Sequence, residues 1–247
     1  FAESKPEPEK PAKPGIQPSE VYTPGATLDR TFTYSGKEIP IYRDRPLNIF
    51  ADSDFIWSEE HPDRLEYLGN EFRTRYGIDV SSYQGDIDWD AVAADDIDYA
   101  MVRVGYRGYG TGVMMTDEYF EKNYEEAREA GVKVGVYFYS QAVSIAEAKE
   151  EADYVLDVLD GRELDFPIAF DIEGAPNASA RTAGMTPAMT TAVVNAFCKR
   201  VEAEGYDTIL YTYTRYLFTN MEIANLQNHK LWIAQYYKVP FYPYRFQ

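Results

Sequence analysis

The feature that most constrains this sequence is a regular alternation of short apolar segments and helical patterns that begins after Gly77. Helical patterns, with apolar residues three or four positions apart, cover about 119–130, 146–159 and 186–204. The apolar segments between them, each typical of a buried strand, are 78–82, 99–105, 133–140, 168–173, 208–212 and 231–235. Alternation of this kind predicts a parallel β-sheet covered by helices.

The sheet could be open or closed into a barrel. An open dinucleotide-binding sheet requires the pattern G-x-G-x-x-G directly after the first strand. The glycines from Gly105 to Gly112 follow the second strand with a different spacing, and we interpret them as a flexible, aromatic-bearing loop between a strand and a helix. Acidic residues at the carboxyl ends of separate strands are typical of a (β/α) barrel active site. We therefore predict an α/β fold, a TIM-like modified (β/α) barrel, over residues 77–247.

Two segments of different character precede the predicted barrel. Residues 1–25 hold six of the fourteen prolines, interleaved with Glu and Lys, which predicts a disordered linker. Residues 26–76 are predicted to form an accessory extension that contains a β-hairpin, with strands at 31–34 and 39–42, and an amphipathic helix over 63–76. A spacer rich in Pro, Glu and Lys suits an exported protein, so we expect an extracellular or wall-associated location, with the signal segment not in this chain.

Composition excludes several classes of function. The chain has 24 basic and 41 acidic residues and a net charge of −17, so phosphate backbones and anionic lipids repel it and we predict no nucleic-acid partner. No apolar run approaches the roughly 20 residues of a membrane span. One cysteine, Cys198, and two histidines, His61 and His229, leave little for a metal site. We expect no metal and no other cofactor, and chemistry carried by carboxylates.

The fourth apolar segment ends in two acids, Asp171 and Glu173. Side chains alternate along a strand, so these two face the same side, with Ile172 opposite. Burying such a pair is costly, and proteins keep one where two pKa values must be driven apart. Asp79 occupies a similar place in the first segment. From the residues alone, Asp171 and Glu173 could instead lie at a solvated strand end or cap a helix. Asp79 could instead be a core acid that is hydrogen-bonded to the backbone.

Six segments between residues 77 and 237 carry a more specific signal. They are Gly77-Ile-Asp-Val-Ser-x-x-Gln84-Gly85-x-Ile-Asp-Trp89, Ala100-Met-Val-Arg103-Val-Gly-Tyr106, Asp117-x-x-Phe120-x-x-Asn123-x-x-x-Ala127, Gly135-Val-Tyr137-Phe-Tyr-Ser140, Phe166-Pro-Ile-Ala-Phe-Asp171-Ile-Glu173 and Leu231-Trp232-Ile-Ala-Gln-Tyr236. In this order they resemble glycoside hydrolase family 25, the Chalaropsis-type lysozymes or N-acetylmuramidases. The extension before Gly77 lies outside the family pattern.

The resemblance implies a barrel of the (β/α)5(β)3 kind that hydrolyses the β-1,4 bond between N-acetylmuramic acid and N-acetylglucosamine in peptidoglycan. It implies that Glu173 is the proton donor, that Asp171 acts on the anomeric side, with assistance from the substrate's own N-acetyl group, and that Asp79 is a third active-site acid. The sugar-contacting aromatic residues that it implies are Tyr137, Tyr211 and Trp232. With these roles, we expect Asp171 to stay ionised and Glu173 to stay protonated. The expected partner is a peptidoglycan glycan strand, bound by a monomer.

Two alternatives depend on particular residues. A family 18 chitinase needs a third acid two residues before Asp171, but Ala169 stands there. Members of family 25 close the barrel with a late strand that carries a further acid, after a Trp-Gln-Tyr segment, and this sequence reaches Gln247 about where that segment is expected. A catalytically impaired wall-binding module of the same fold is therefore the alternative to an active enzyme.

Overall fold

The structure, a computed structural model, describes residues 28–42, 47–48, 50–175, 177–226 and 228–244. The predicted linker at 1–25 lies outside these residues. None of the helices in the described ranges is both long and apolar enough to cross a membrane.

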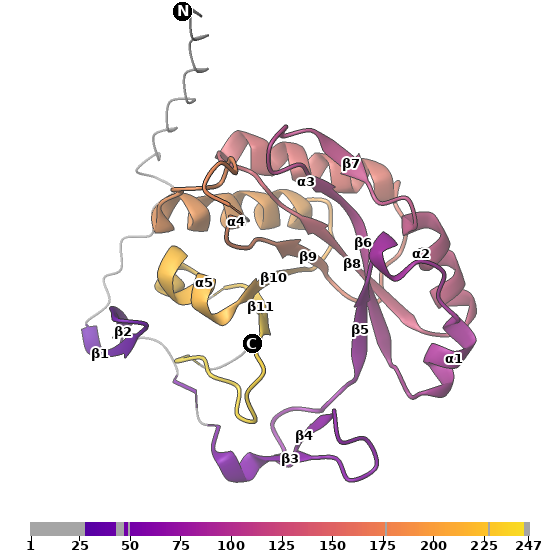
Figure 1. Ribbon diagram of the computed structural model, residues 1–247, viewed down its shortest axis with the longest axis horizontal. Coiled ribbons are helices and arrows are strands. Elements are labelled where there is room, and N and C mark those ends of the chain that lie inside the picture. Colours follow the sequence, from indigo (N-terminus) through magenta and orange to yellow (C-terminus); the bar gives the residue numbers. More distant parts are fainter. Residues whose placement is uncertain (1–27, 43–46, 49, 176, 227, 245–247) are drawn as a thin grey trace, which may run out of the picture.

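A curled parallel sheet forms the centre of the molecule (Figure 1). Its strands, in spatial order, are β11 (Lys230–Ala234), β10 (Thr208–Tyr213), β9 (Ile168–Asp171), β8 (Lys133–Tyr139), β6 (Tyr99–Arg107) and β5 (Gly77–Val80). All five pairings along this path are parallel. The six apolar segments of the sequence are these six strands, which confirms the predicted parallel sheet.

The sheet curls into a half-barrel, with β5 and β11 as its two edges. Within the described residues these edge strands do not pair with each other. The closed barrel is therefore not confirmed, because the β-pairings that would join the two edges are not present among the described strands.

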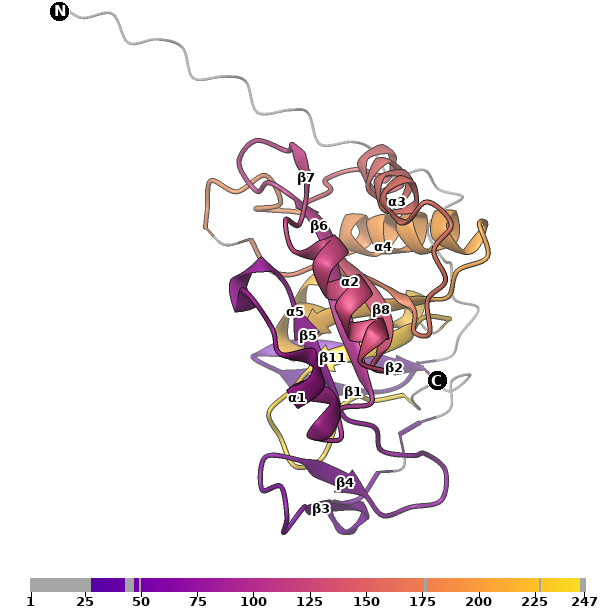
Figure 2. The same ribbon diagram turned by 90° about the vertical axis from the view of Figure 1, so that its right-hand side faces the viewer.

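Helices cover the outer face of the half-barrel (Figures 1 and 2). They are α1 (Trp89–Ala94), α2 (Phe120–Glu129), α3 (Ile145–Leu159) and α4 (Pro187–Glu202), with α5 (Thr214–Asn220) after β10. Local chemistry fixes their ends: the side chain of Ser144 caps α3, and Thr186 caps α4 ahead of a first-turn proline. The described residues also form three short 3₁₀ turns, η2 (Asp52–Asp54), η3 (Ser82–Gln84) and η4 (Ile223–Asn225).

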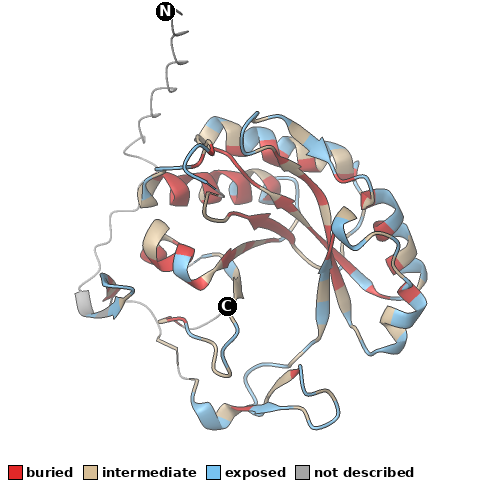
Figure 3. Cartoon of the chain, in the orientation of Figure 1, coloured by how far each residue is buried: buried red, intermediate tan, exposed pale blue. Residues whose placement is uncertain are grey.

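The hydrophobic core lies between the sheet and these helices (Figure 3). Every residue of β9 is buried, because β9 is an inner strand with a neighbour on each side and helix α4 packed over it. The rings of Phe170 on β9 and Phe197 on α4 lie 4.5 Å apart. This central position buries Asp171, the last residue of β9.

The hairpin of the N-terminal extension packs against the main domain. Strands β1 (Leu28–Tyr34) and β2 (Lys37–Tyr42) form an antiparallel hairpin whose Ile39 and Ile41 join the main core. The ring of Tyr34 lies 5.0 Å from that of Phe218 on α5. The Nζ of Lys37 donates a hydrogen bond to the carbonyl of Thr219 at 2.7 Å.

The predicted helix over 63–76 is wrong. Strands β3 (Phe55–Trp57) and β4 (Leu65–Tyr67) pair there instead, beside the amino end of β5 (Figures 1 and 2). The rings of Phe50, Phe55 and Tyr67 cluster at centroid distances of 5.2 to 5.4 Å, and Phe72 joins them. This aromatic cluster outweighs the helical spacing of the apolar residues.

The glycine-rich segment after β6 is also different from our interpretation. It forms the turn of a hairpin between β6 and β7 (Met114–Thr116), which pair antiparallel, and not a loop between a strand and a helix. A Cβ at Gly105 would collide with the carbonyl oxygen of Met115, so a glycine is required where the two strands meet. Gly112, with φ of 71°, closes the turn by donating to the Gly108 carbonyl at 2.8 Å.

Candidate active site

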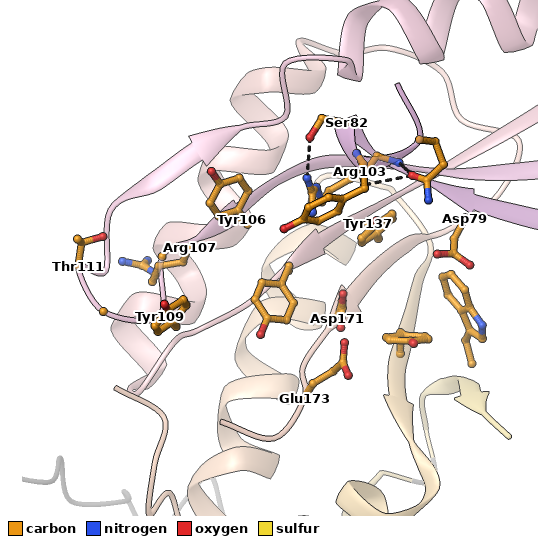
Figure 4. Close-up of a pocket in the computed structure, with 18 residues that line it drawn as sticks. Asp79, Ser82, Arg103, Tyr106, Arg107, Tyr109, Thr111, Tyr137, Asp171 and Glu173 are labelled. Atoms are coloured by element: carbon orange, nitrogen blue, oxygen red, sulfur yellow. Dashed lines mark hydrogen bonds between the residues drawn. The ribbon is translucent and has the colours of Figure 1, made fainter. Parts of the chain in front are cut away.

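A cleft of about 880 Å³ opens at the carboxyl ends of the parallel strands (Figure 4). Each of the site residues predicted from the sequence lines it: Asp79, Asp171, Glu173, Tyr137, Tyr211 and Trp232. They come from β5, β8, β9 with the residues that follow it, β10 and β11. Because parallel strands all end at one edge of the sheet, residues far apart in the sequence meet there.

The three acids differ in exposure because of where their strands lie. Asp171 ends the central strand β9 and is 6% exposed. Glu173 follows two residues later and is partly buried, while Asp79 on the edge strand β5 is exposed. Strand pairing places Asp171 between Tyr139 of β8 and Tyr211 of β10.

The surroundings raise the pKa of all three acids. Burial is the largest cause for Asp171, whose pKa lies well above its ordinary value, and the charges of Glu173 and Asp79 raise it further. The Arg103 guanidinium opposes this shift. Loss of surrounding water raises the pKa of Glu173 and of Asp79. One oxygen of Asp171, Oδ1, has no hydrogen-bond partner among the described residues.

One of these shifts runs against an expectation from the sequence. Asp171 was expected to stay ionised while Glu173 kept its proton, but Asp171 is the most buried of the three acids and faces two neighbouring carboxyls. Its environment therefore raises its pKa, in the direction opposite to that expectation. The sequence placed the acids two residues apart but held no information on how deeply each would be buried.

Aromatic side chains form the wall of the cleft on the side of β10 and β11. The rings of Tyr211 and Trp232 lie 4.5 Å apart, inclined at 65°. Burial raises the pKa of Tyr137 on β8 and that of Tyr211, so both hydroxyls stay neutral. Neutral hydroxyls and ring faces together suit a ligand with many hydroxyl groups and apolar C–H faces.

Sequence reasoning missed several residues that line the same cleft. Tyr139 follows Tyr137 by two positions on β8, so the alternation of side chains along a strand could have identified it. Burial raises the pKa of Tyr139 to about 12. Arg103, in the segment Ala100–Tyr106, also lines the cleft, although its sequence context gave no sign of a role there. The turn of the β6–β7 hairpin brings Tyr109 and Thr111 to the cleft, and no local pattern indicated that hairpin.

The arrangement suits proton transfer to and from a bound carbohydrate. Acids with raised pKa values can hold a proton near neutral pH and release it to a leaving group. Among the residues that the structure describes, no group of three or more His, Cys, Asp or Glu side chains is placed to hold a metal ion.

A family model described as Glycosyl hydrolases family 25 matches residues 78–246. The autolytic lysozyme of Clostridium acetobutylicum is 28% identical over 160 residues, which are 65% of this chain and 44% of that protein. The chain spans about half the length of the curated relatives it matches.

Solved structures show the same fold. The bacterial lysozyme from Streptomyces coelicolor matches with a TM-score of 0.56 and 26% identity, over 66% of this chain and 75% of that one. The modular autolysin LytC from Streptococcus pneumoniae, in complex with a synthetic peptidoglycan ligand, matches with a TM-score of 0.60 and 22% identity, over 85% of this chain and 44% of that one. The structural match covers 85% of this chain, which is a larger share than residues 77–247 make up. The structural similarity therefore extends into the N-terminal extension.

Proposed function

Because the chain belongs to glycosyl hydrolase family 25, we propose that it cleaves the β-1,4 bond between N-acetylmuramic acid and N-acetylglucosamine in peptidoglycan. The observation that carries this proposal is the meeting of Asp79, Asp171 and Glu173, all with raised pKa values, in one aromatic-walled cleft. Glycoside hydrolysis requires an acid to protonate the leaving oxygen and a second carboxyl group near the anomeric carbon. The peptidoglycan ligand bound to the related autolysin supports the choice of substrate.

Glu173 is the proposed proton donor. It is partly buried, so its pKa is raised, yet it still borders the open part of the cleft where a leaving sugar would lie. As the bond between the anomeric carbon and O4 of N-acetylglucosamine breaks, the proton of Glu173 passes to O4. Water then adds to the anomeric carbon and returns a proton to Glu173.

Asp171 is the proposed partner on the anomeric side. Positive charge develops on the anomeric carbon, or on the nitrogen of the substrate's N-acetyl group if that group assists. The ionised form of Asp171 is the one that stabilises this charge, and a positive charge next to the carboxyl favours that form by lowering its raised pKa. Asp79, at the edge of the same cleft, adds negative charge and helps to place the two other acids.

The proposal has further parts, which concern the partner, the form of the barrel and the division of the chain. The proposed partner is a peptidoglycan glycan strand, bound by a monomer that acts outside the membrane, with Tyr137, Tyr211 and Trp232 in contact with sugars. The (β/α)5(β)3 form of the barrel belongs to this proposal, as does the division into a linker (1–25), an extension (26–76) and a hydrolase domain (77–247).

Digestion of purified peptidoglycan tests the reaction. We expect new reducing ends at muramic acid, with chitin a poor substrate, and no release of ends by the Glu173→Gln variant. Reducing ends at N-acetylglucosamine would show a glucosaminidase and overturn the assignment. Sedimentation with peptidoglycan without any release of ends would instead support the wall-binding module of the same fold.

A further inference from the structure

A second pair of aromatic side chains lies in the cleft, on the β5–β6 side and away from Tyr211 and Trp232. Tyr83 belongs to η3, directly after β5, and is 87% exposed. Tyr106 lies near the end of β6 and is partly buried. Neither ring takes part in the proposed reaction. Holding so exposed a tyrosine in place without a ligand costs hydration and conformational freedom, so a neighbouring group must stabilise its position.

Arg103 holds both rings. Its guanidinium carbon lies 5.1 Å from the ring centroid of Tyr83 and 5.3 Å from that of Tyr106. These are cation–π distances, and Arg103 Nη2 also donates a hydrogen bond at 3.1 Å to Ser82 Oγ, next to Tyr83 in the chain. Figure 4 shows Arg103 and Tyr106 on the opposite side of the cleft from Glu173.

Asp117 in turn holds Arg103. Its side chain is fully buried, and Arg103 donates to Asp117 Oδ2 from Nε at 2.7 Å and from Nη2 at 2.6 Å. The same carboxylate accepts backbone N–H groups from Ser82, at 3.1 Å, and from Tyr119, at 2.9 Å. Four donors thus meet on Asp117, which joins the η3 turn, β6 and the start of α2. No part of this carboxylate is left to bind a substrate, so Asp117 acts only through Arg103 and Ser82.

This ion pair also decides what kind of ligand the rings suit. The positive charge of Arg103 is balanced by Asp117, so the surface offers ring faces and hydroxyl groups with no free cation for an anionic ligand. The acids of β9 lie between this pair of rings and the aromatic wall of β10 and β11 in the order of the sheet. A linear glycan that crosses the acids would therefore reach aromatic surfaces on both sides.

We propose that Tyr83 and Tyr106 form a second sugar-stacking surface, which binds an uncharged face of a pyranose ring outside the pair of sugars that is cleaved, and that Arg103 and Asp117 are its positioning residues. The inference rests on the proposed function for the identity of the glycan. Rings that are already fixed by Arg103 lose little freedom when a sugar stacks on them, so the contact adds to affinity.

Glycan length provides the test. We would measure kcat/KM on a tetrasaccharide and on an octasaccharide of alternating N-acetylglucosamine and N-acetylmuramic acid. Tyr83→Ala is expected to lower kcat/KM for the octasaccharide about fivefold more than for the tetrasaccharide, mainly through KM. Tyr83→Trp keeps an aromatic face and should recover most of this loss. Trp57→Ala, an exposed aromatic on β3 that does not line the cleft, is the matched control and should change neither value.

A binding measurement separates this inference from the proposed reaction. In the Glu173→Gln background, calorimetry with the octasaccharide should give a Kd about fivefold weaker after Tyr83→Ala. If the octasaccharide binds through Tyr83 but the wild type releases no reducing ends, the proposed reaction is wrong and the proposed sugar-stacking surface is supported. Cleavage by the wild type with the same loss at both lengths, or with no loss, would overturn the surface alone. A wild type that neither binds nor cleaves glycans would overturn both.

Asp117→Asn tests the positioning role. Removing the charge but keeping the shape should reproduce the length-dependent loss of Tyr83→Ala, although Asp117 is buried and remote from any ligand. It should also shift the acid limb of the pH–rate profile downward, because an unbalanced Arg103 lowers the pKa of Asp171 more strongly. A loss equal at both glycan lengths, with an unchanged pH profile, would show a purely structural residue. If this variant does not fold, Tyr83→Ala alone still decides the proposal.

Discussion

Asp171 and Glu151 are both buried carboxylic acids, and the protein surrounds them in opposite ways. Glu151 on α3 is fully buried and accepts hydrogen bonds from Arg107 Nε at 2.7 Å, Ser140 Oγ at 2.6 Å and the Gln141 N–H at 3.3 Å. Asp171 is nearly as buried, but its Oδ1 has no hydrogen-bond partner among the described residues. Two further acids face Asp171, whereas an arginine faces Glu151.

The difference shows how to tell a structural acid from a reactive one. Burial raises the pKa of Glu151 only to about 7, because Ser140 and Arg107 oppose the shift. The pair ties α3 to β6 and thereby to the hairpin turn that borders the cleft, where Arg107 Nη1 also donates to the Gly112 carbonyl at 3.0 Å. An acid left without partners in a cleft destabilises the fold locally and is retained for chemistry.

The largest expected effect is on the reacting acids. Glu173→Gln removes the transferable proton and should lower kcat/KM on peptidoglycan about 10²–10⁴-fold. Asp171→Asn removes the charge that forms in the transition state and should lower it by a similar factor. On a substrate with an activated leaving group, which needs no proton, Glu173→Gln should retain far more activity than Asp171→Asn.

Equal losses on the activated substrate would show that the two roles are wrongly assigned. Asp79→Asn provides the internal comparison. If Asp79 only positions its neighbours, this variant should lose less activity than Glu173→Gln or Asp171→Asn. Thermal unfolding should show that Asp171→Asn is at least as stable as the wild type, because it removes a buried acid from the repulsion of two others.

The structural acid should behave in the opposite way. Glu151→Ala leaves Arg107, only 5% exposed, without its buried partner, and should lower the free energy of unfolding by about 3–5 kcal/mol. Glu150 is the matched control, because it contacts the same arginine at 3.3 Å but its side chain is 60% exposed. Glu150→Ala should cost about 0–1 kcal/mol in urea unfolding. Similar losses of unfolding free energy for Glu151→Ala and Glu150→Ala would contradict the structural role of Glu151.

The smallest expected effect is a pH dependence of stability. Glu151 has a pKa of about 7 when folded and 4.5 as an ordinary value. Between these pH values the folded protein binds a proton that the unfolded chain has released, so the free energy of unfolding falls as the pH rises through this range. Tm should therefore be higher at pH 5.5 than at pH 7.5, and Glu151→Gln should reduce this slope while Glu150→Gln leaves it. Identical slopes for the wild type and Glu151→Gln would contradict the assignment.

The sequence by itself determined the six parallel strands and placed its predicted site residues at one edge of the sheet. Apolar residues two positions apart indicate strands such as β8, and apolar residues three or four positions apart indicate helices such as α4. Local signals such as Thr186-Pro187 indicate where a helix begins. Since parallel strands all end at one edge, the same patterns placed Asp79, Asp171 and Glu173 together. The helix expected at 63–76 failed because the ring contacts of Phe50 with Tyr67 depend on a turn that the apolar spacing does not encode.

Tertiary structure alone decided the environment of each group. Arg107 and Glu151 lie 44 residues apart, and Arg103 and Asp117 lie 14 apart, so no periodicity links them. Whether the edges of the sheet meet, how deeply Asp171 is buried and which ring stacks on which guanidinium all depend on how the elements pack. The pKa of an acid follows from the water and charges around it, and these are set by chain segments remote in sequence. The residue types were therefore readable from the chain, while their protonation and their partners were not.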